Sequence, residues 1–145
     1  MSLIEEVKLT YRNKLKASDR PKITGAQDAY KVFLQSWDFD QIDLLEECKA
    51  MFLDRQLRVM SLASISKGGF NGTVVDLRIV FAMALKRRAN SLILAHNHPS
   101  GNLKPSHRDI SLTRNFVAAG KIMKIEVEDH LVITRDGFHS IIYDL

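Results

Sequence analysis

The chain lacks the features that cross-link a protein, anchor it in a membrane or direct its export. Cys48 is the single cysteine among 145 residues, which excludes an intramolecular disulfide framework and favours a reducing, cytoplasmic location. No apolar run is long enough to span a bilayer, and the opening residues carry no signal-peptide pattern. There are no internal repeats. With 46% hydrophobic residues, this length is typical of one domain with a real core.

Several motifs of nucleotide-binding and zinc-dependent proteins are also missing. The glycine-rich segment 68–72 lacks the Gly-Lys-Ser/Thr ending of a phosphate loop; we interpret it as a tight crossover or as a flexible flank of a substrate groove. There is no His-Glu-x-x-His of gluzincin proteases, and one cysteine cannot supply the Cys-x-x-Cys of zinc deaminases. A (β/α)8 amidohydrolase barrel needs roughly 250 residues.

The net charge is only +4, and much of the positive excess lies ahead of residue 23. A basic arm can contact nucleic acid. Without an aromatic-interleaved RNA-binding pattern or zinc-finger spacing, a solvated leader is the favoured interpretation. In this leader Val7, Leu9 and Tyr11 alternate with polar residues, which predicts a strand over 6–11. We therefore divide the chain into a basic leader, residues 1–22, and one domain, residues 23–145.

The apolar periodicity of the domain predicts three helices and a set of strands. A capping-box pattern at Thr24 opens the first helix, and Gly120 is expected to end the third as its C′ residue. The predicted helices cover 24–36, 76–89 and 107–119, and the strands 46–54, 57–66, 91–96, 122–127, 131–134 and 138–143. This order predicts the α/β class, a single-domain mixed β-sheet flanked by helices.

The stretch from His96 to Asp109 contains the most informative polar residues. It follows a buried strand, so His96 and His98, two residues apart, lie on one face. A loop with two prolines and a glycine follows, and we expect it to bring Asp109 back toward the histidines. Two histidines and a carboxylate suit a catalytic zinc site with a fourth position for water. Ser106 and Asp109 also match a capping box, a purely structural alternative.

The spacing His-x-His, seven residues, Ser, two residues, Asp resembles the signature of the JAMM (MPN+) metallopeptidases. The fuller string His-Asn-His-Pro-Ser-Gly, followed by Lys-Pro-Ser-x-x-Asp, is similar to the RadC-like branch, from about Pro21 to the end of the chain. The resemblance implies a JAB/MPN-like fold with cytidine-deaminase-like layering. It also implies zinc-dependent hydrolysis of a peptide or isopeptide bond, with zinc held by His96, His98 and Asp109 and with Ser106 stabilising the oxyanion.

The resemblance further implies an upstream glutamate that acts as general base. The spacing Glu-x6-Leu-Asp of the branch matches Glu46 through Leu53-Asp54. Glu46 shares a predicted strand face with Cys48 and Phe52, which we expect to point inward, whereas Glu47 lies on the other face. We therefore prefer Glu46 as the base and keep Glu47 as the alternative. Cys48 departs from the branch, which often has an aromatic residue there.

The Asp129-His130 dipeptide also matches the RadC-like pattern. We interpret His130 as structural, with support of the metal ligands as the alternative. A function of another class is a nucleic-acid-associated module with a structural or vestigial metal site, because the RadC name was attached to DNA repair. Full-length RadC-like proteins usually carry an N-terminal helix-hairpin-helix segment. We expect the residues before Thr24 to be too few to form that segment. We expect a peptide or protein substrate and no membrane partner, and a dimer is compatible with this size.

Overall fold

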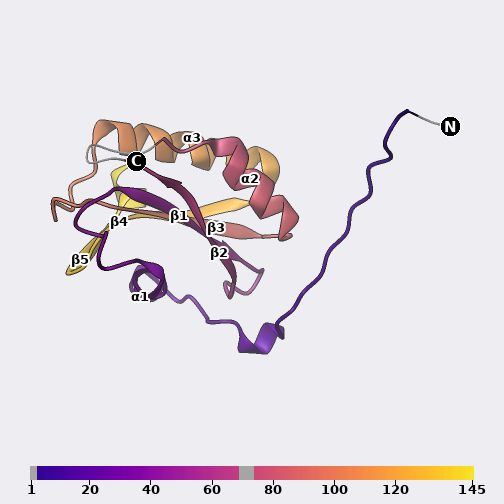
Figure 1. Cartoon of the computed structure of the whole chain (residues 1–145), viewed down its shortest axis with the longest axis horizontal. Helices are drawn as coiled ribbons and strands as arrows, with labels where there is room; N and C mark the ends of the chain where they lie inside the picture. The colour runs from indigo at the N-terminus through magenta and orange to yellow at the C-terminus, as the bar shows by residue number, and fades with distance from the viewer. Residues whose placement is uncertain (1–2, 69–73) are drawn as a thin grey trace.

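The computed structural model describes residues 3–68 and 74–145, which form one layered α/β domain preceded by an extended arm (Figure 1). The five strands of this part of the chain form a mixed sheet in the order β2-β1-β3-β4-β5, in which only β3 and β4 pair in parallel. The elements are η1 Ala17–Asp19, α1 Ala26–Ser36, β1 Glu47–Leu53, β2 Val59–Lys67, α2 Leu77–Lys86, β3 Ser91–Asn97, α3 His107–Met123, β4 Glu126–Thr134, β5 Gly137–Ser140 and η2 Ile141–Asp144. The predicted fold class is confirmed. No helix in the described ranges is long and apolar enough to cross a membrane.

The sheet is covered on both faces, α1 lying on one side and α2 with α3 on the other (Figure 1). Strand alternation sends Met51 and Leu53 of β1 to the α1 side, and Ala50 and Phe52 to the α2 and α3 side. Every residue of β1 and of β3 is consequently buried. The predicted burial of the face with Cys48, Ala50 and Phe52 is confirmed, and α1 buries the opposite face of β1 as well.

The start of β1, the end of β3 and the N-terminus of α3 lie close together at one edge of the sheet. β1 begins where its antiparallel neighbour β3 ends, so that Cys48 lies opposite His96 in the register. The loop after β3 leads into the N-terminus of α3, which crosses over to the parallel strand β4. Residues that flank these ends are therefore brought together although they are far apart in the sequence. In open α/β sheets, this edge at the carboxyl end of a parallel strand is a common ligand site.

Several predicted boundaries are wrong near the two ends of the chain. The strand expected over 6–11 is not formed, and residues 3–16 carry neither helix nor strand. Helix α1 is capped by Gly25 without a side-chain bond, and Thr24 instead pairs its backbone N–H with Asp28 at 2.9 Å. In place of the strands expected over 122–127 and 131–134 there is one continuous strand, β4, which begins at Glu126, and residues 122–123 belong to α3. The last strand stops at Ser140, where a 3-10 turn follows.

Gly120 does not end α3, which continues to Met123. The left-handed residue after the helix is Lys124, with a φ of 59°. A Cβ at position 120 would lie 2.4 Å from the carbonyl oxygen of Ile125. This glycine is needed for the close approach of the helix to the following strand, and not for a turn.

Candidate metal centre

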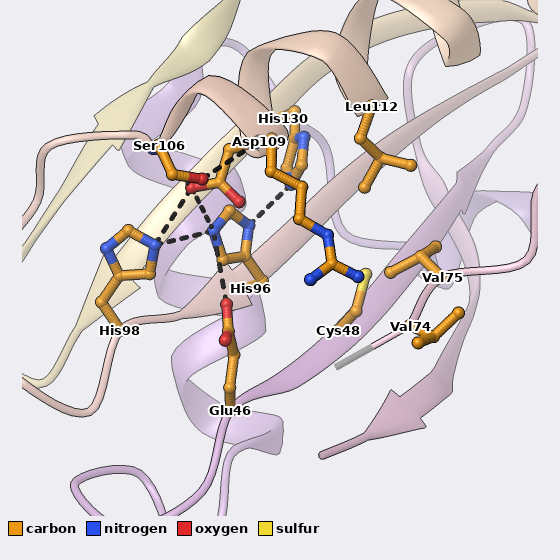
Figure 2. A pocket seen from close by; sticks show the side chains of 11 residues that line it. Glu46, Cys48, Val74, Val75, His96, His98, Ser106, Asp109, Leu112 and His130 are labelled. Carbon is orange, nitrogen blue, oxygen red and sulfur yellow. Dashed lines mark hydrogen bonds and ion pairs between the residues drawn. The ribbon is translucent and has the colours of Figure 1, made fainter. Parts of the chain in front are cut away.

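The end of β3 presents its two histidines to one side and the asparagine between them to the other. The Nε2 atoms of His96 and His98 are 2.9 Å apart (Figure 2). Asn97 points away, accepts the backbone N–H of Glu47 at 2.7 Å, and donates to the carbonyls of Ile42 and Leu45 at 2.8 Å. The two-residue repeat of the strand thus places both histidines on one side, while Asn97 connects the end of β3 to the segment that precedes β1.

The N-terminus of α3 brings a carboxylate to the histidine pair. Asp109 Oδ2 lies 3.3 Å from the Nε2 atom of each histidine. The same oxygen accepts the backbone N–H of Ser106 at 2.8 Å, and Ser106 Oγ accepts the backbone N–H of Asp109 at 3.0 Å. The predicted capping box is therefore present and, in addition, orients Asp109 toward the histidines. The capping-box interpretation is confirmed, and the position of Asp109 is compatible with a ligand role as well.

The structure separates the two candidate glutamates. Glu46 precedes β1 and points toward the histidines, with its Oε1 atom 3.9 Å from His96 Nε2 (Figure 2). Glu47 lies on the opposite face of the sheet, where it accepts a hydrogen bond from the Ser64 hydroxyl and lies 4.0 Å from the Lys67 ammonium. Of the two, only Glu46 is placed to act in this centre.

These side chains line a cavity of about 290 Å³. The polar half contains the histidine and carboxylate groups, and the other half contains Cys48, Val74, Val75 and Leu112 (Figure 2). Arg108 also lines the cavity. Burial, followed by the charge of Glu46, raises the pKa of the Cys48 thiol to about 12. The ligand atoms that lie close together belong to Glu46, His96, His98 and Asp109, in the polar half of the cavity.

The charges in this cluster favour a bound cation. Burial opposes the ionised form of Asp109, but hydrogen bonds from the two histidines outweigh it and hold its pKa well below the usual range. Burial also opposes the charged form of His98, yet Asp109 and the Asn102 carbonyl outweigh it and raise the pKa of His98. The nitrogen and oxygen atoms of Glu46 and the other three groups lie within 4.8 Å of one another. Such a concentration of acceptor atoms is stable only with a proton or a metal ion among them.

The hydrogen bonds of the histidine rings agree with a metal site. His98 Nδ1 lies 2.7 Å from the Asn102 carbonyl oxygen, which can only accept, so Nδ1 carries the proton when the ring is neutral, and Nε2 then has a free lone pair. That lone pair faces the cluster. Two imidazole nitrogens with one or two carboxylates form a donor set that suits zinc and other borderline divalent ions. The residues present therefore fit a metal ion.

Two further residues form hydrogen bonds that start from the Nδ1 side of His96, opposite the Nε2 atom that faces the other ligands. His130 Nε2 lies 2.8 Å from His96 Nδ1, and Thr113 Oγ1 lies 2.6 Å from His130 Nδ1. Sequence reasoning favoured a structural role for His130 and did not single out Thr113. Its position four residues after Asp109 on a helix places it on the same face, which was the available signal. Asp129 points elsewhere and accepts from Ser140.

Residues 23–144 match the family described as the RadC-like JAB domain. The chain is 41% identical over 123 residues to a UPF0758 protein of Flavobacterium johnsoniae, an alignment that covers 83% of this chain and 52% of that protein. A UPF0758 protein of Porphyromonas gingivalis is 36% identical over 121 residues, with 81% and 51% covered. The chain spans about half the length of these curated relatives. It belongs to the RadC-like JAB domain family, in the JAB/MPN superfamily.

Proposed function

We propose that this domain is a zinc-dependent hydrolase that cleaves an amide bond, either peptide or isopeptide. The observation that carries the proposal is the convergence of His96, His98, Asp109 and Glu46, whose ligand atoms lie within 4.8 Å at the wall of a cavity. His96, His98 and Asp109 are the proposed ligands, which leaves a position for water as in catalytic zinc sites. Glu46 is farther from His96 Nε2 than Asp109 is, 3.9 Å against 3.3 Å, which suits a base beside the centre.

A bound zinc ion would polarise the scissile carbonyl and lower the pKa of its water to about 7. In this mechanism the Glu46 carboxylate accepts the proton of the attacking water and passes it to the leaving amine. Ser106 Oγ accepts a backbone N–H in the capping box, so its own hydroxyl proton is free to donate. We assign that proton to the oxyanion of the tetrahedral intermediate, a contribution typically worth about 10²–10³ in rate.

The cavity also suggests how a substrate would bind. About 290 Å³ is near the lower end of small-molecule sites, so the cavity suits one or two residues of a peptide. The apolar half would receive an apolar side chain next to the scissile bond. Arg108 forms no hydrogen bond or ion pair with another described residue of the chain, so its guanidinium is free to pair with a substrate carboxylate. We propose a peptide or protein tail with these two features as substrate, and a cytoplasmic location.

Metal content is the first test. Elemental analysis of the wild-type protein should give about one equivalent of zinc, and His96→Ala and Asp109→Ala should lose it. Glu46→Gln should keep the zinc and lose turnover on a library of peptide and isopeptide substrates. Glu47→Gln, on the opposite face of β1, is the matched control and should keep both. A wild-type protein that takes up no metal even after zinc is added, or a fully active Glu46→Gln variant, would contradict the proposal.

The second candidate function is a nucleic-acid-associated module. The exposed arm ahead of residue 17 favours it, since its basic residues Lys8, Arg12, Lys14 and Lys16 are all solvent-exposed. Binding through such an arm should weaken steeply as salt rises, because it releases condensed counterions. A titration of duplex and single-stranded DNA at increasing salt tests this. Absence of binding at low salt would exclude the module.

A further inference from the structure

His130 is a buried histidine with a partner on each ring nitrogen. It is 1% exposed, and Thr113 beside it is fully buried. Its Nε2 atom faces His96 at 2.8 Å, and its Nδ1 atom faces Thr113 Oγ1 at 2.6 Å. Thr113 Oγ1 in turn lies 2.7 Å from the backbone oxygen of Asp109. Three hydrogen bonds therefore connect two of the proposed ligands, His96 and Asp109, through two residues outside the proposed ligand set.

The direction of these hydrogen bonds follows from counting protons. The carbonyl oxygen of Asp109 has no proton, so the Thr113 hydroxyl must supply the one between them. Thr113 Oγ1 can then only accept from His130, which places the ring proton of His130 on Nδ1. The unprotonated Nε2 of His130 must accept from Nδ1 of His96. Nδ1 of His96 therefore carries a proton on the side away from the cluster, and in the neutral ring the lone pair of Nε2 points into the cluster.

The surroundings of His130 agree with a neutral ring. His130 is enclosed in the domain interior, and burial disfavours the charged form of an imidazole. The neighbouring carboxylate of Asp129 is engaged by the Ser140 hydroxyl and by the backbone N–H of His130. Metal-binding histidines usually donate their second N–H to a carboxylate, a backbone carbonyl or water. In this protein the acceptor is a second imidazole, which orients the ring and adds no negative charge.

We infer that His130 and Thr113 are positioning residues that hold His96 in its Nδ1–H tautomer and couple its orientation to Asp109. This inference rests on the proposed metal site, because its consequence is the affinity of that site. His130 lies on β4 and Thr113 on α3, so this series of hydrogen bonds, which we call the relay, also links the sheet to the helix that carries Asp109. Loss of such supporting hydrogen bonds typically costs 10–100-fold in metal affinity.

The experiment compares zinc affinity and ring tautomer in matched variants. His130→Leu removes both hydrogen bonds, and Thr113→Val removes only the hydroxyl. His130→Gln and Thr113→Ser keep a donor and an acceptor and serve as rescue variants. His139→Leu is the control, since His139 pairs with Asp144 at 2.5 Å, outside the cluster. Zinc affinity is measured by competition with a chromophoric chelator, and the tautomer of His96 by ¹⁵N NMR of the metal-free protein at pH 8.

We expect His130→Leu and Thr113→Val to weaken zinc binding about 10–100-fold and to lose the single Nδ1–H tautomer of His96. Both rescue variants should recover most of the affinity, and the control should match the wild type. Unchanged zinc affinity and unchanged tautomer in Thr113→Val would overturn the inference. If His130→Leu does not fold, Thr113→Val and the rescue variants carry the test. A wild-type protein that binds no zinc refutes the proposed function, whereas the tautomer of His96 still decides the relay.

Discussion

Asp109 is expected to have two separable tasks, and two substitutions distinguish them. Its Oδ2 atom accepts the backbone N–H of Ser106 at 2.8 Å and lies 3.3 Å from His96 and His98. Asp109→Asn keeps an oxygen that can accept in the capping box but removes the charge. Asp109→Ala removes the oxygen and the charge together. The stability that the capping box contributes should therefore fall only with the second substitution, and metal affinity should fall with both.

The size of each effect follows from the contacts. Loss of a capping interaction costs about 1 kcal/mol, and for a domain of this length 1 kcal/mol lowers the melting temperature by about 3 °C. Asp109→Ala should show this decrease without metal, and Asp109→Asn should not. A missing ligand carboxylate should cost at least about 100-fold in zinc affinity, more than loss of a supporting hydrogen bond. Both variants should show this decrease.

Thermal melts in the presence of a chelator and zinc competition titrations measure the two effects independently. Both are done at pH 8, where protons compete less with zinc for the histidine nitrogens. Zinc binding by Asp109→Asn at wild-type strength would refute the assignment of Asp109 as a ligand. A wild-type melting temperature for metal-free Asp109→Ala would refute the stabilising role of the capping box.

Three further predictions concern other parts of the domain. Cys48, whose pKa is raised to about 12, should not react with a disulfide reagent at pH 8 until the protein is unfolded in urea; rapid labelling of the native state would contradict its burial. Burial opposes ionisation of Asp54, but hydrogen bonds from the backbone N–H of Arg58 and from the Arg20 guanidinium at 2.9 Å outweigh it and lower the pKa of Asp54. The ionised carboxylate therefore stabilises the fold above pH ~4, and this stabilisation is lost as pH falls through the lowered pKa. Arg20→Met should lower the free energy of unfolding by about 1 kcal/mol at neutral pH after allowance for solvent screening, and by less in acid. Equal losses at both pH values in urea unfolding would argue against the ion pair of Arg20 with Asp54. Gly120→Ala should destabilise by about 2 kcal/mol despite better helix propensity, because its Cβ would meet a backbone carbonyl at 2.4 Å; a raised melting temperature would show that the contact relaxes.

The errors in the predicted elements have local physical causes. Gly120 resembles a helix-ending glycine, yet it serves a close contact, and Lys124 takes the left-handed conformation instead. The 122–127 segment is apolar enough for a strand, but α3 continues through Met123 and β4 begins at Glu126. Propensity alone does not decide such boundaries, since packing of neighbouring elements overrides it. The alternating residues 6–11 form no strand, because a strand needs a partner edge.

The sequence by itself determined those parts of the site that depend on local geometry. His96 and His98 share a face because a strand repeats every two residues, and Ser106 orients Asp109 because both belong to one capping box. The family resemblance pointed to Glu46, but only the tertiary structure decided how Glu46 and His130 come to lie beside these groups. The antiparallel register of β1 with β3 places Glu46 beside the histidines, and the parallel pairing of β3 with β4 places His130 behind His96. Contacts of this kind depend on which strands pair and in which register, and no local pattern encodes that.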